Sequence, residues 1–151
     1  MKRIALALLT IAIFARPIAA EPIGQWYSGF GQGTVEYGIK HDSAGSDYFY
    51  IACSPDFGTS INITVGGTDA PPGKNVVVTI GADEFDLPIG RDGYFTTHSH
   101  IAYDIFRTLW SSLRRGTVMR VRLANGQSTV FSLRGSGRIL PKQHCRTDFE
   151  R

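Results

Sequence analysis

Short runs of alternating apolar and polar residues, separated by turn-forming residues, recur along most of this chain. Residues 33–40 alternate as GTVEYGIK, while 61–65 and 75–81 are rich in isoleucine and valine. Such runs are typical of strands that bury one face, and turn signals about every eight to twelve residues favour antiparallel pairing. The pattern predicts a mainly β fold, either an antiparallel barrel or a sandwich.

One segment, 99–116, breaks this pattern with a helical period, and we expect a single amphipathic helix packed on the β structure. Its apolar stripe consists of Ile101, Ile105, Phe106, Leu109, Trp110 and Leu113. Ser99 is the expected N-cap, because a serine oxygen accepts from a free N–H of the first turn. Gly116 is expected to adopt a left-handed conformation just beyond the last turn. Arg114 and Arg115 occupy that turn, where a cation offsets the helix dipole.

A hairpin around Asn125-Gly126 follows the helix. A two-residue loop would place Arg120 opposite Phe131, on one face of the hairpin. A three-residue loop at 124–126, with Gly126 left-handed, instead places Met119 opposite Phe131 and keeps every apolar side chain on the same face. We therefore predict the three-residue loop.

Six arginines and no acidic residue lie between residues 113 and 138. Alternation along the predicted hairpin turns Arg120, Arg122 and Arg134 toward water. We expect these three side chains to form a contact surface for an acidic envelope protein or for an anionic surface of phospholipid headgroups.

Two shorter features complete the β pattern. Residues 85–90 and 94–98 flank the turn-forming sequence RDG, which predicts a further hairpin. The nearby acidic residues lack the spaced ligands of a calcium loop, so an exposed acidic turn is predicted. They are Asp83, Glu84 and Asp86.

The N-terminus has the pattern of an export signal. Lys2 and Arg3 precede an apolar run at 4–14, which is shorter than the roughly 20 residues that span a membrane. Small residues at Ala19-Ala20 complete the pattern. We expect a signal peptide at 1–20, cleaved after Ala20, and a single β-rich domain at 21–151 of a bacterial periplasmic or secreted protein. No transmembrane segment is expected in the mature chain.

Removal of the predicted signal changes the charge of the chain. The formal net charge is +3 for the whole sequence, but residues 21–151 contain 13 basic and 13 acidic side chains. A chain with no net charge has no general attraction to nucleic acid, and none is predicted as a partner. The charges are still segregated, with −8 over 21–104 and +8 over 105–151. Either the two halves complement each other in the fold, or a basic face meets an anionic partner.

The two cysteines, Cys53 and Cys145, both lie in the predicted mature domain. A distant pair in an oxidising compartment predicts a structural disulfide. A free reactive thiol is the alternative, although neither cysteine has the CxxC spacing that marks one.

The C-terminal part of the chain resembles the tail of exported two-cysteine β proteins of the invasion-associated locus B family, and of a periplasmic accessory family of type VI secretion. In both, an FxLxG strand leads through a short helix to a late cysteine. The matching residues here are Phe131, Leu133, Gly135 and Cys145. Ser136 and Gly137 depart from the pattern, since an apolar or aromatic residue and an alanine-rich turn are more typical. The resemblance implies an envelope β domain without known catalysis.

Few residues have the spacing of a catalytic or metal site. His98 and His100 could share a metal ion, with a third ligand from His41, His144 or a carboxylate, but solvated histidines are the competing interpretation. The loop 41–47, HDSAGSD, superficially resembles a serine-protease nucleophile loop, but a small domain lacks the rest of that scaffold, so a polar hairpin loop is predicted. No cofactor is predicted.

The function predicted from these features is that of a non-enzymatic binding or accessory protein of the envelope, acting through protein contacts. One alternative is a small enzyme or metal-binding protein that uses His98 and His100. Another is a periplasmic inhibitor of a cell-wall hydrolase that presents loop 41–47. Convergence of the two histidines with a third ligand in a pocket would distinguish the first alternative.

Overall fold

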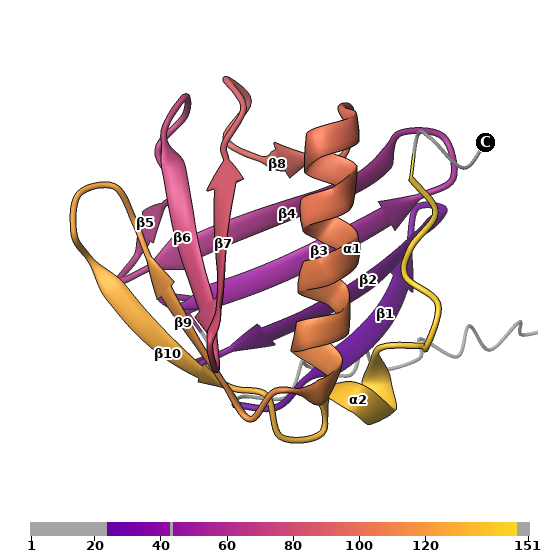
Figure 1. Ribbon diagram of the computed structural model, residues 1–151. Helices are drawn as coiled ribbons and strands as arrows, with labels where there is room; N and C mark the ends of the chain where they lie inside the picture. The colour runs from indigo at the N-terminus through magenta and orange to yellow at the C-terminus, as the bar shows by residue number, and fades with distance from the viewer. Residues whose placement is uncertain (1–23, 43, 148–151) are drawn as a thin grey trace, which may run out of the picture.

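The computed structural model describes residues 24–42 and 44–147, and its strands form two antiparallel sheets that face each other (Figure 1). The predicted signal peptide at 1–20 lies outside the described residues. A mainly β fold with one main helix packed on it is confirmed, and of the two predicted architectures the pair of facing sheets corresponds to a sandwich.

The first sheet, called sheet A, contains most of the N-terminal half of the chain. Its order is β1-β2-β3-β4-β5, and the short β8 also pairs with β4. The bounds are β1 Tyr27–Gly31, β2 Thr34–Lys40, β3 Tyr48–Ser54, β4 Gly58–Val65, β5 Thr68–Asp69 and β8 Phe95–Thr96. Alternate residues of β2, β3 and β4 are buried on the inner face, as their alternating sequence predicts.

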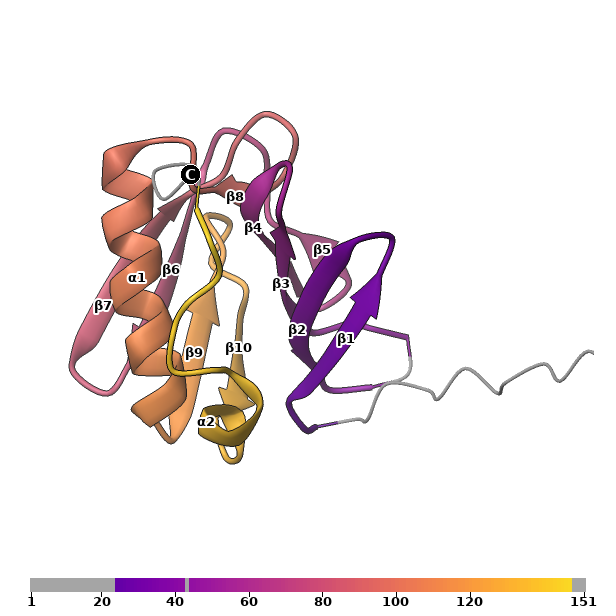
Figure 2. The ribbon, with the colours of Figure 1, turned by 90° about the vertical axis from the view of Figure 1, so that its right-hand side faces the viewer.

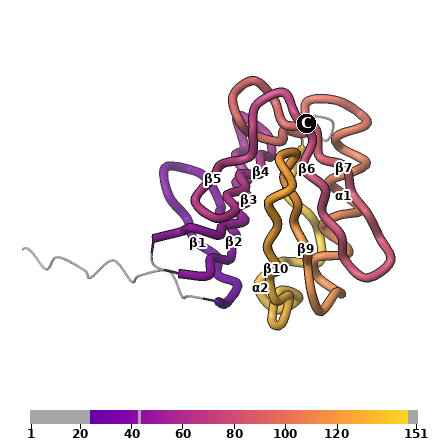
Figure 3. The backbone as a smooth tube through the Cα atoms, turned by 90° about the vertical axis from the view of Figure 1, so that its left-hand side faces the viewer, coloured from indigo at the N-terminus to yellow at the C-terminus, as the bar shows by residue number. Residues whose placement is uncertain are grey.

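The second sheet, called sheet B, has the order β10-β9-β6-β7. Its strands are β6 Asn75–Ile80, β7 Asp83–Pro88, β9 Val118–Arg122 and β10 Ser128–Ser132. In Figure 2 and Figure 3, β10 is the strand of sheet B that lies nearest to sheet A. A hydrogen bond of 3.1 Å from Trp26 Nε1 to the carbonyl of Ser132 joins the two layers there.

Helix α1, His100–Arg115, lies beside β7 in the layer of sheet B and covers the rest of the inner face of sheet A (Figure 2). The ring of Trp110 meets Tyr37 of β2 edge-on, with centroids 5.4 Å apart. Ser99 caps the helix as predicted, since its hydroxyl accepts from the N–H of Ala102 at 3.1 Å. Ile101 does not belong to the buried stripe, because its side chain is 74% exposed. Among the described residues, no helix has both the length and the apolar character needed to cross a membrane.

The predicted register of the β9–β10 hairpin is confirmed. Met119 pairs with Phe131, and both side chains are fully buried. Gly126 has a φ of 92°, the left-handed conformation that the three-residue loop requires. Leu123 N–H donates to the carbonyl of Gln127 at 2.8 Å and closes the loop.

The expected conformation of Gly116 is wrong. Its φ of −71° and ψ of 171° are extended backbone, which any residue adopts. Glycine is needed here for space, because a Cβ would lie 2.5 Å from a methyl of Ile80 and 2.8 Å from one of Leu133. The end of α1 thus packs directly onto sheet B, and a side chain at this position would separate them.

Two further β predictions are wrong. The RDG segment forms a tight turn, with Gly90 N–H donating to the carbonyl of Tyr94 at 2.7 Å, but the strands that flank it do not pair. Strand β7 pairs with β6 of sheet B, whereas β8 pairs with β4 of sheet A, so the chain crosses between the sheets at this turn. The acidic residues predicted to form a turn lie instead on β7.

The predicted disulfide is confirmed. Cys53, at the end of β3, is bonded to Cys145 in the C-terminal segment, with their Cα atoms 5.6 Å apart. The bond links residues 92 positions apart, which stabilises the fold by about 2–4 kcal/mol. A disulfide is typical of proteins that fold in an oxidising compartment.

Candidate functional site

A cavity of about 500 Å³, called the basic pocket, lies where α1 ends beside the β9–β10 hairpin. Three arginines line it: Arg114 from the last turn of α1, Arg134 from just beyond β10, and Arg138 from the short helix α2, Ser136–Ile139. The remaining wall is formed by Gly116, Thr117, Val118, Ser132, Leu133, Gly135 and Gly137. None of these residues is acidic.

The local sequence RGSGR, residues 134–138, builds this pocket. Gly135 reverses the chain with a φ of 87°, which favours glycine. The buried hydroxyl of Ser136 then lies 2.6 Å from the carbonyl of Leu113 and 2.7 Å from that of Leu133. Gly137 allows α2 to approach α1, because a Cβ there would lie only 2.7 Å from the carbonyl oxygen of Arg114. Ser136 and Gly137 therefore bring α2, with Arg138, close to the end of α1.

The guanidinium groups of the basic pocket have no acidic partner among the described residues. Arg114 is half-buried, and its Nε donates to the carbonyl of Leu140 at 3.0 Å, which leaves its terminal nitrogens available. Arg134 and Arg138 are exposed. Three permanent cations around one cavity produce a strongly positive potential, and the planar fork of arginine suits carboxylate and phosphate oxygens.

All three arginines predicted as one surface are exposed, and one of them also lines the basic pocket. Arg120 and Arg122 are exposed on the outer face of β9, beside Thr79 and Val77 of β6. Arg134 lies past the end of β10 and lines the basic pocket.

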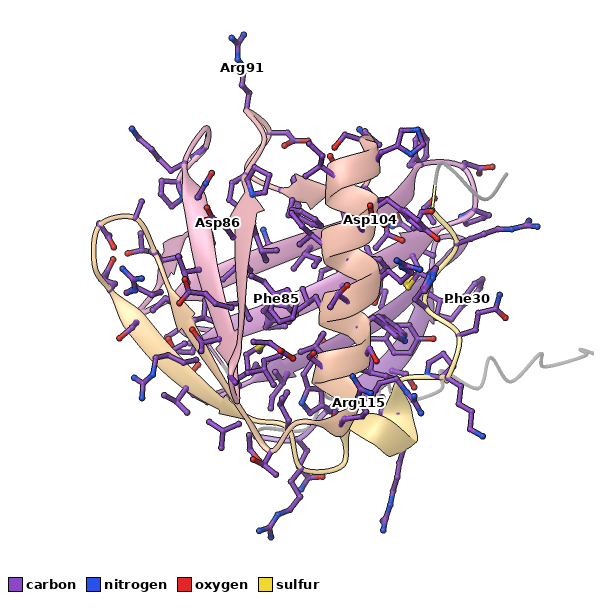
Figure 4. All side chains as sticks on the ribbon, in the orientation of Figure 1. Phe30, Phe85, Asp86, Arg91, Asp104 and Arg115 are labelled. Atoms are coloured by element: carbon purple, nitrogen blue, oxygen red, sulfur yellow. A yellow bond between two sulfur atoms is a disulfide. The ribbon has the colours of Figure 1, made fainter. Side chains whose placement is uncertain are left out.

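A second cavity of about 400 Å³, called the apolar groove, lies at the end of sheet A where the β1–β2 and β3–β4 turns meet the C-terminal segment. Its lining residues are Phe30, Gly33, Val35, Tyr37, Cys53, Ser54, Pro55, Pro141, Gln143, His144, Cys145 and Arg146. The Phe30 side chain is 75% exposed and stands at the outer side of the molecule (Figure 4). Phe57, in the adjacent turn, is 81% exposed. An exposed aromatic side chain that lines an apolar cavity is a feature of interaction sites, and Phe30 meets that description.

The groove runs along an open edge of sheet A, because no described strand lies on the outer side of β1. Gly31 and Thr34 close the β1–β2 turn as a pair, so hydrogen-bonded pairs alternate from there. The N–H and C=O groups of Ser28 and Phe30 consequently point away from β2. Among the described residues, nothing hydrogen bonds to these backbone groups.

The C-terminal wall of the groove is tied to the fold at several points. The disulfide fixes Cys145, and Trp110 Nε1 donates to the carbonyl of Pro141 at 3.0 Å. Thr59, which is fully buried, donates its hydroxyl to the carbonyl of Arg146 at 3.1 Å. The groove is therefore preformed by segments that are distant in sequence.

The predicted loop at 41–47 uses its polar residues to join the two sheets. Asp47 Oδ2 lies 3.0 Å from His41 Nδ1 and accepts from the hydroxyl of Thr129 on β10 at 2.9 Å, while Oδ1 accepts from the N–H of Gly66 at 2.8 Å. Burial raises the pKa of the Asp47 carboxyl, but these hydrogen bonds outweigh it, so the pKa lies below its usual range. Asp42 bonds to Ser46 within the loop, and this lowers the pKa of Asp42. The geometry is that of a structural link between layers.

The structure does not bring the candidate metal ligands together within its described part. His98 and His100 are exposed on either side of the N-cap of α1. His41 lies against Phe131, and His144 packs against Phe106, so both proposed third ligands are engaged elsewhere. No group of three histidine, cysteine or acidic side chains in this part has the arrangement of a metal site.

Sequence reasoning missed the apolar groove and two of the three arginines of the basic pocket. The sequence pattern assigns Arg114 only to the helix terminus, and Arg138 only to a turn. The exposed Phe30 lies in β1, which has little alternation because Gly29 and Gly31 interrupt it. The glycines of RGSGR were the available signal, since two glycines around a serine permit a close approach of backbones.

Comparison with known proteins identifies a family but no characterised relative. A family model described as YfjT matches residues 24–140, from the residues before β1 to the end of α2. No curated protein and no solved structure matches the chain. The matched region includes the whole RGSGR segment and ends before Cys145. The family model matches well over half of this chain's residues, so the chain belongs to the YfjT family.

Proposed function

We propose that this chain is an exported, non-enzymatic binding protein of the bacterial envelope, and that it binds an extended segment of another envelope protein in the apolar groove. The observation that carries the proposal is the exposure of Phe30 on a preformed groove, beside a strand edge with which no described strand pairs. Export is supported by the N-terminal pattern, and the Cys53–Cys145 disulfide favours a protein that folds outside the reducing cytoplasm.

The mode of binding follows from the geometry of β1. An extended peptide beside β1 can pair with the outward backbone groups of Ser28 and Phe30, as in β-strand addition. Alternate side chains of that peptide then point to the same face as Phe30, and so into the groove. Backbone pairing supplies affinity, and the apolar walls favour partners with aromatic or aliphatic residues at alternate positions.

The alternative of a hydrolase inhibitor presenting loop 41–47 has less support. His41 and Asp47 are directed at Phe131 and Thr129 of the same chain, so the polar groups of the loop serve the fold. An enzyme using His98 and His100 lacks a third ligand among the described residues.

A photocrosslinking amino acid at position 30, introduced into the exported protein in cells, tests the proposal. The matched control is position 101, because Ile101 is also apolar and 74% exposed but lies on α1, away from the groove. We expect a discrete adduct with an envelope protein from position 30 only. With that partner purified, Phe30→Ser should weaken binding at least about tenfold, as for an aromatic anchor, and Ile101→Ser should leave it unchanged. Equal adducts, or equal affinities of the two variants, would contradict the proposal.

A further inference from the structure

We infer that the basic pocket binds the phosphate group of an anionic lipid headgroup, and that the β9–β10 side of sheet B lies against the lipid surface. The inference does not rest on the proposed function, because the basic pocket and the apolar groove share no lining residue.

The chemistry of the pocket selects an anion with several acceptor oxygens. Arg114, Arg134 and Arg138 line a cavity of about 500 Å³ and have no carboxylate partner among the described residues. Unpaired guanidinium groups that share a cavity repel one another, and a bound phosphate removes that repulsion while accepting forked hydrogen bonds from them. The hydroxyls of Thr117 and Ser132 add neutral donors at the same wall.

The pocket is supported rigidly, which favours recognition over diffuse attraction. Ser136 is 1% exposed and lies within hydrogen-bonding distance of two carbonyls, and Gly137 is in close contact with Arg114. Arg114 is further fixed through Nε at Leu140. A second hollow of about 390 Å³ adjoins the pocket across Arg134 and Arg138. The partly exposed Ile139 offers apolar surface there next to the same two cations.

Exposed apolar side chains around the pocket argue for a lipid rather than a soluble phosphate. Val118 lines the basic pocket and is 48% exposed, and Val130 of β10 is 40% exposed on the same outer face. Both valines neighbour Arg120, since Val130 is its partner in the β9–β10 register. Apolar side chains interspersed with arginines are the composition of surfaces that sit at the boundary of headgroups and acyl chains.

On the outer face of sheet B, basic side chains lie on β9 and acidic side chains lie on β7. This separation sets how the protein is oriented at a lipid surface. In the register of β9, β6 and β7, Arg120 is aligned with Thr79 and then Glu84, and Arg122 with Val77 and then Asp86. Asp86 lies on β7, the edge strand beside α1 (Figure 4). An anionic surface therefore attracts the β9–β10 side of this face and repels the β7 side.

Vesicle cosedimentation with the full, oxidised mature protein tests the inference, using phosphatidylcholine vesicles with and without phosphatidylglycerol. We expect binding only when phosphatidylglycerol is present, and weaker binding as salt is raised. The variant Arg134→Gln/Arg138→Gln should bind at least about tenfold more weakly. The control Arg120→Gln/Arg122→Gln removes the same charge from the contact face outside the pocket and should weaken binding less than the pocket variant does, because its exposed charges are screened by salt. Unchanged thermal unfolding of both variants confirms that they fold.

Other outcomes would overturn the inference. Equal losses in the two variants would show diffuse attraction without a pocket. Equal binding to neutral vesicles would show an apolar contact only. Titration with inorganic pyrophosphate tests whether the phosphate group belongs to a lipid or to a soluble compound. Arginine-dependent binding of pyrophosphate without vesicle binding would assign the pocket to a soluble phosphate compound. Displacement of the protein from vesicles by polyglutamate, at concentrations where pyrophosphate has no effect, would indicate an acidic protein instead.

Discussion

The basic pocket and the apolar groove adjoin the same C-terminal segment but are built in opposite ways. The basic pocket depends on one short sequence, 134–138, that folds back on the end of α1. The apolar groove is assembled from the β1–β2 turn, the β3–β4 turn and residues 141–146, which only the disulfide and a few hydrogen bonds bring together. A locally encoded site depends on backbone packing, whereas a site assembled from distant segments depends on the links between them.

The largest expected effect comes from removing the Cys53–Cys145 disulfide, which lines the apolar groove and is not part of the basic pocket. Replacing Cys53 and Cys145 by alanine should lower the free energy of unfolding by about 2–4 kcal/mol, because the unfolded chain gains freedom. In denaturant unfolding, wild-type protein with its disulfide reduced should behave similarly. Hydrogen exchange should accelerate at 141–147, and partner binding in the groove should weaken. If vesicle binding weakened as much as groove binding, the two sites would not be structurally independent.

A substitution in the RGSGR segment should impair the basic pocket and leave the apolar groove intact. It should also lower the free energy of unfolding by less than loss of the disulfide does. In Gly137→Ala the new methyl meets the carbonyl oxygen of Arg114, so α2 must shift, at a cost of about 1–3 kcal/mol. Vesicle binding should fall while binding in the groove stays unchanged.

The matched control for this substitution is Gly135→Asn. A Cβ at residue 135 would have no other atom within 4 Å, and asparagine tolerates the positive φ found there. Because only the positive φ is strained, thermal unfolding should show a cost of no more than about 1 kcal/mol, smaller than that of Gly137→Ala. Equal destabilisation by both variants would mean that contact with Arg114 does not limit the approach of α2.

The smallest expected effect concerns the link between sheets at Asp47, which belongs to neither site. Asp47→Asn should lower stability by about 1 kcal/mol at neutral pH, since charged acceptors make the stronger hydrogen bonds. The folded pKa of Asp47 is lowered, so its contribution is present above the unfolded pKa of about 3.9 and is lost as pH falls through the folded value. Urea unfolding across a pH series should show the two proteins converging in acid.

Asp42→Asn provides the control for that series, because Asp42 lies in the same loop but, among the described residues, bonds only within it. Its effect on stability should be smaller. Binding in the groove and to vesicles should be unchanged in both variants. A loss of either activity in Asp47→Asn would show that the link between sheets also shapes a site.

Local features of this protein could be predicted because each depends on neighbours in sequence. The cap of α1 by Ser99 and the left-handed Gly126 follow from rules that operate within one turn. The pairing of Met119 with Phe131 follows because a shift of one residue would bury arginine. The same rules predict the wrong conformation at Gly116, where the reason for glycine is the distant side chain of Ile80.

Neither candidate site could be predicted in full from such local rules. Arg134 alternates with the β10 residues, which groups it with Arg120, but its cavity is shared with Arg114 of the preceding helix. The RDG turn has the sequence of a hairpin, yet β7 and β8 join different sheets because each finds its partner elsewhere. Strand pairing between distant segments depends on the whole set of competing strands, and no local pattern specifies it.

The sequence by itself determined the mainly β class, the single main helix with its cap, the hairpin register and the pairing of the two cysteines. These depend on the period of apolar residues and on there being one possible cysteine partner. Tertiary structure alone decided which strands share a sheet, that Phe30 remains exposed beside a groove, and that three arginines surround one cavity. The physical reason is that burial and charge clustering depend on which distant surfaces meet, and that is settled by packing of the whole core.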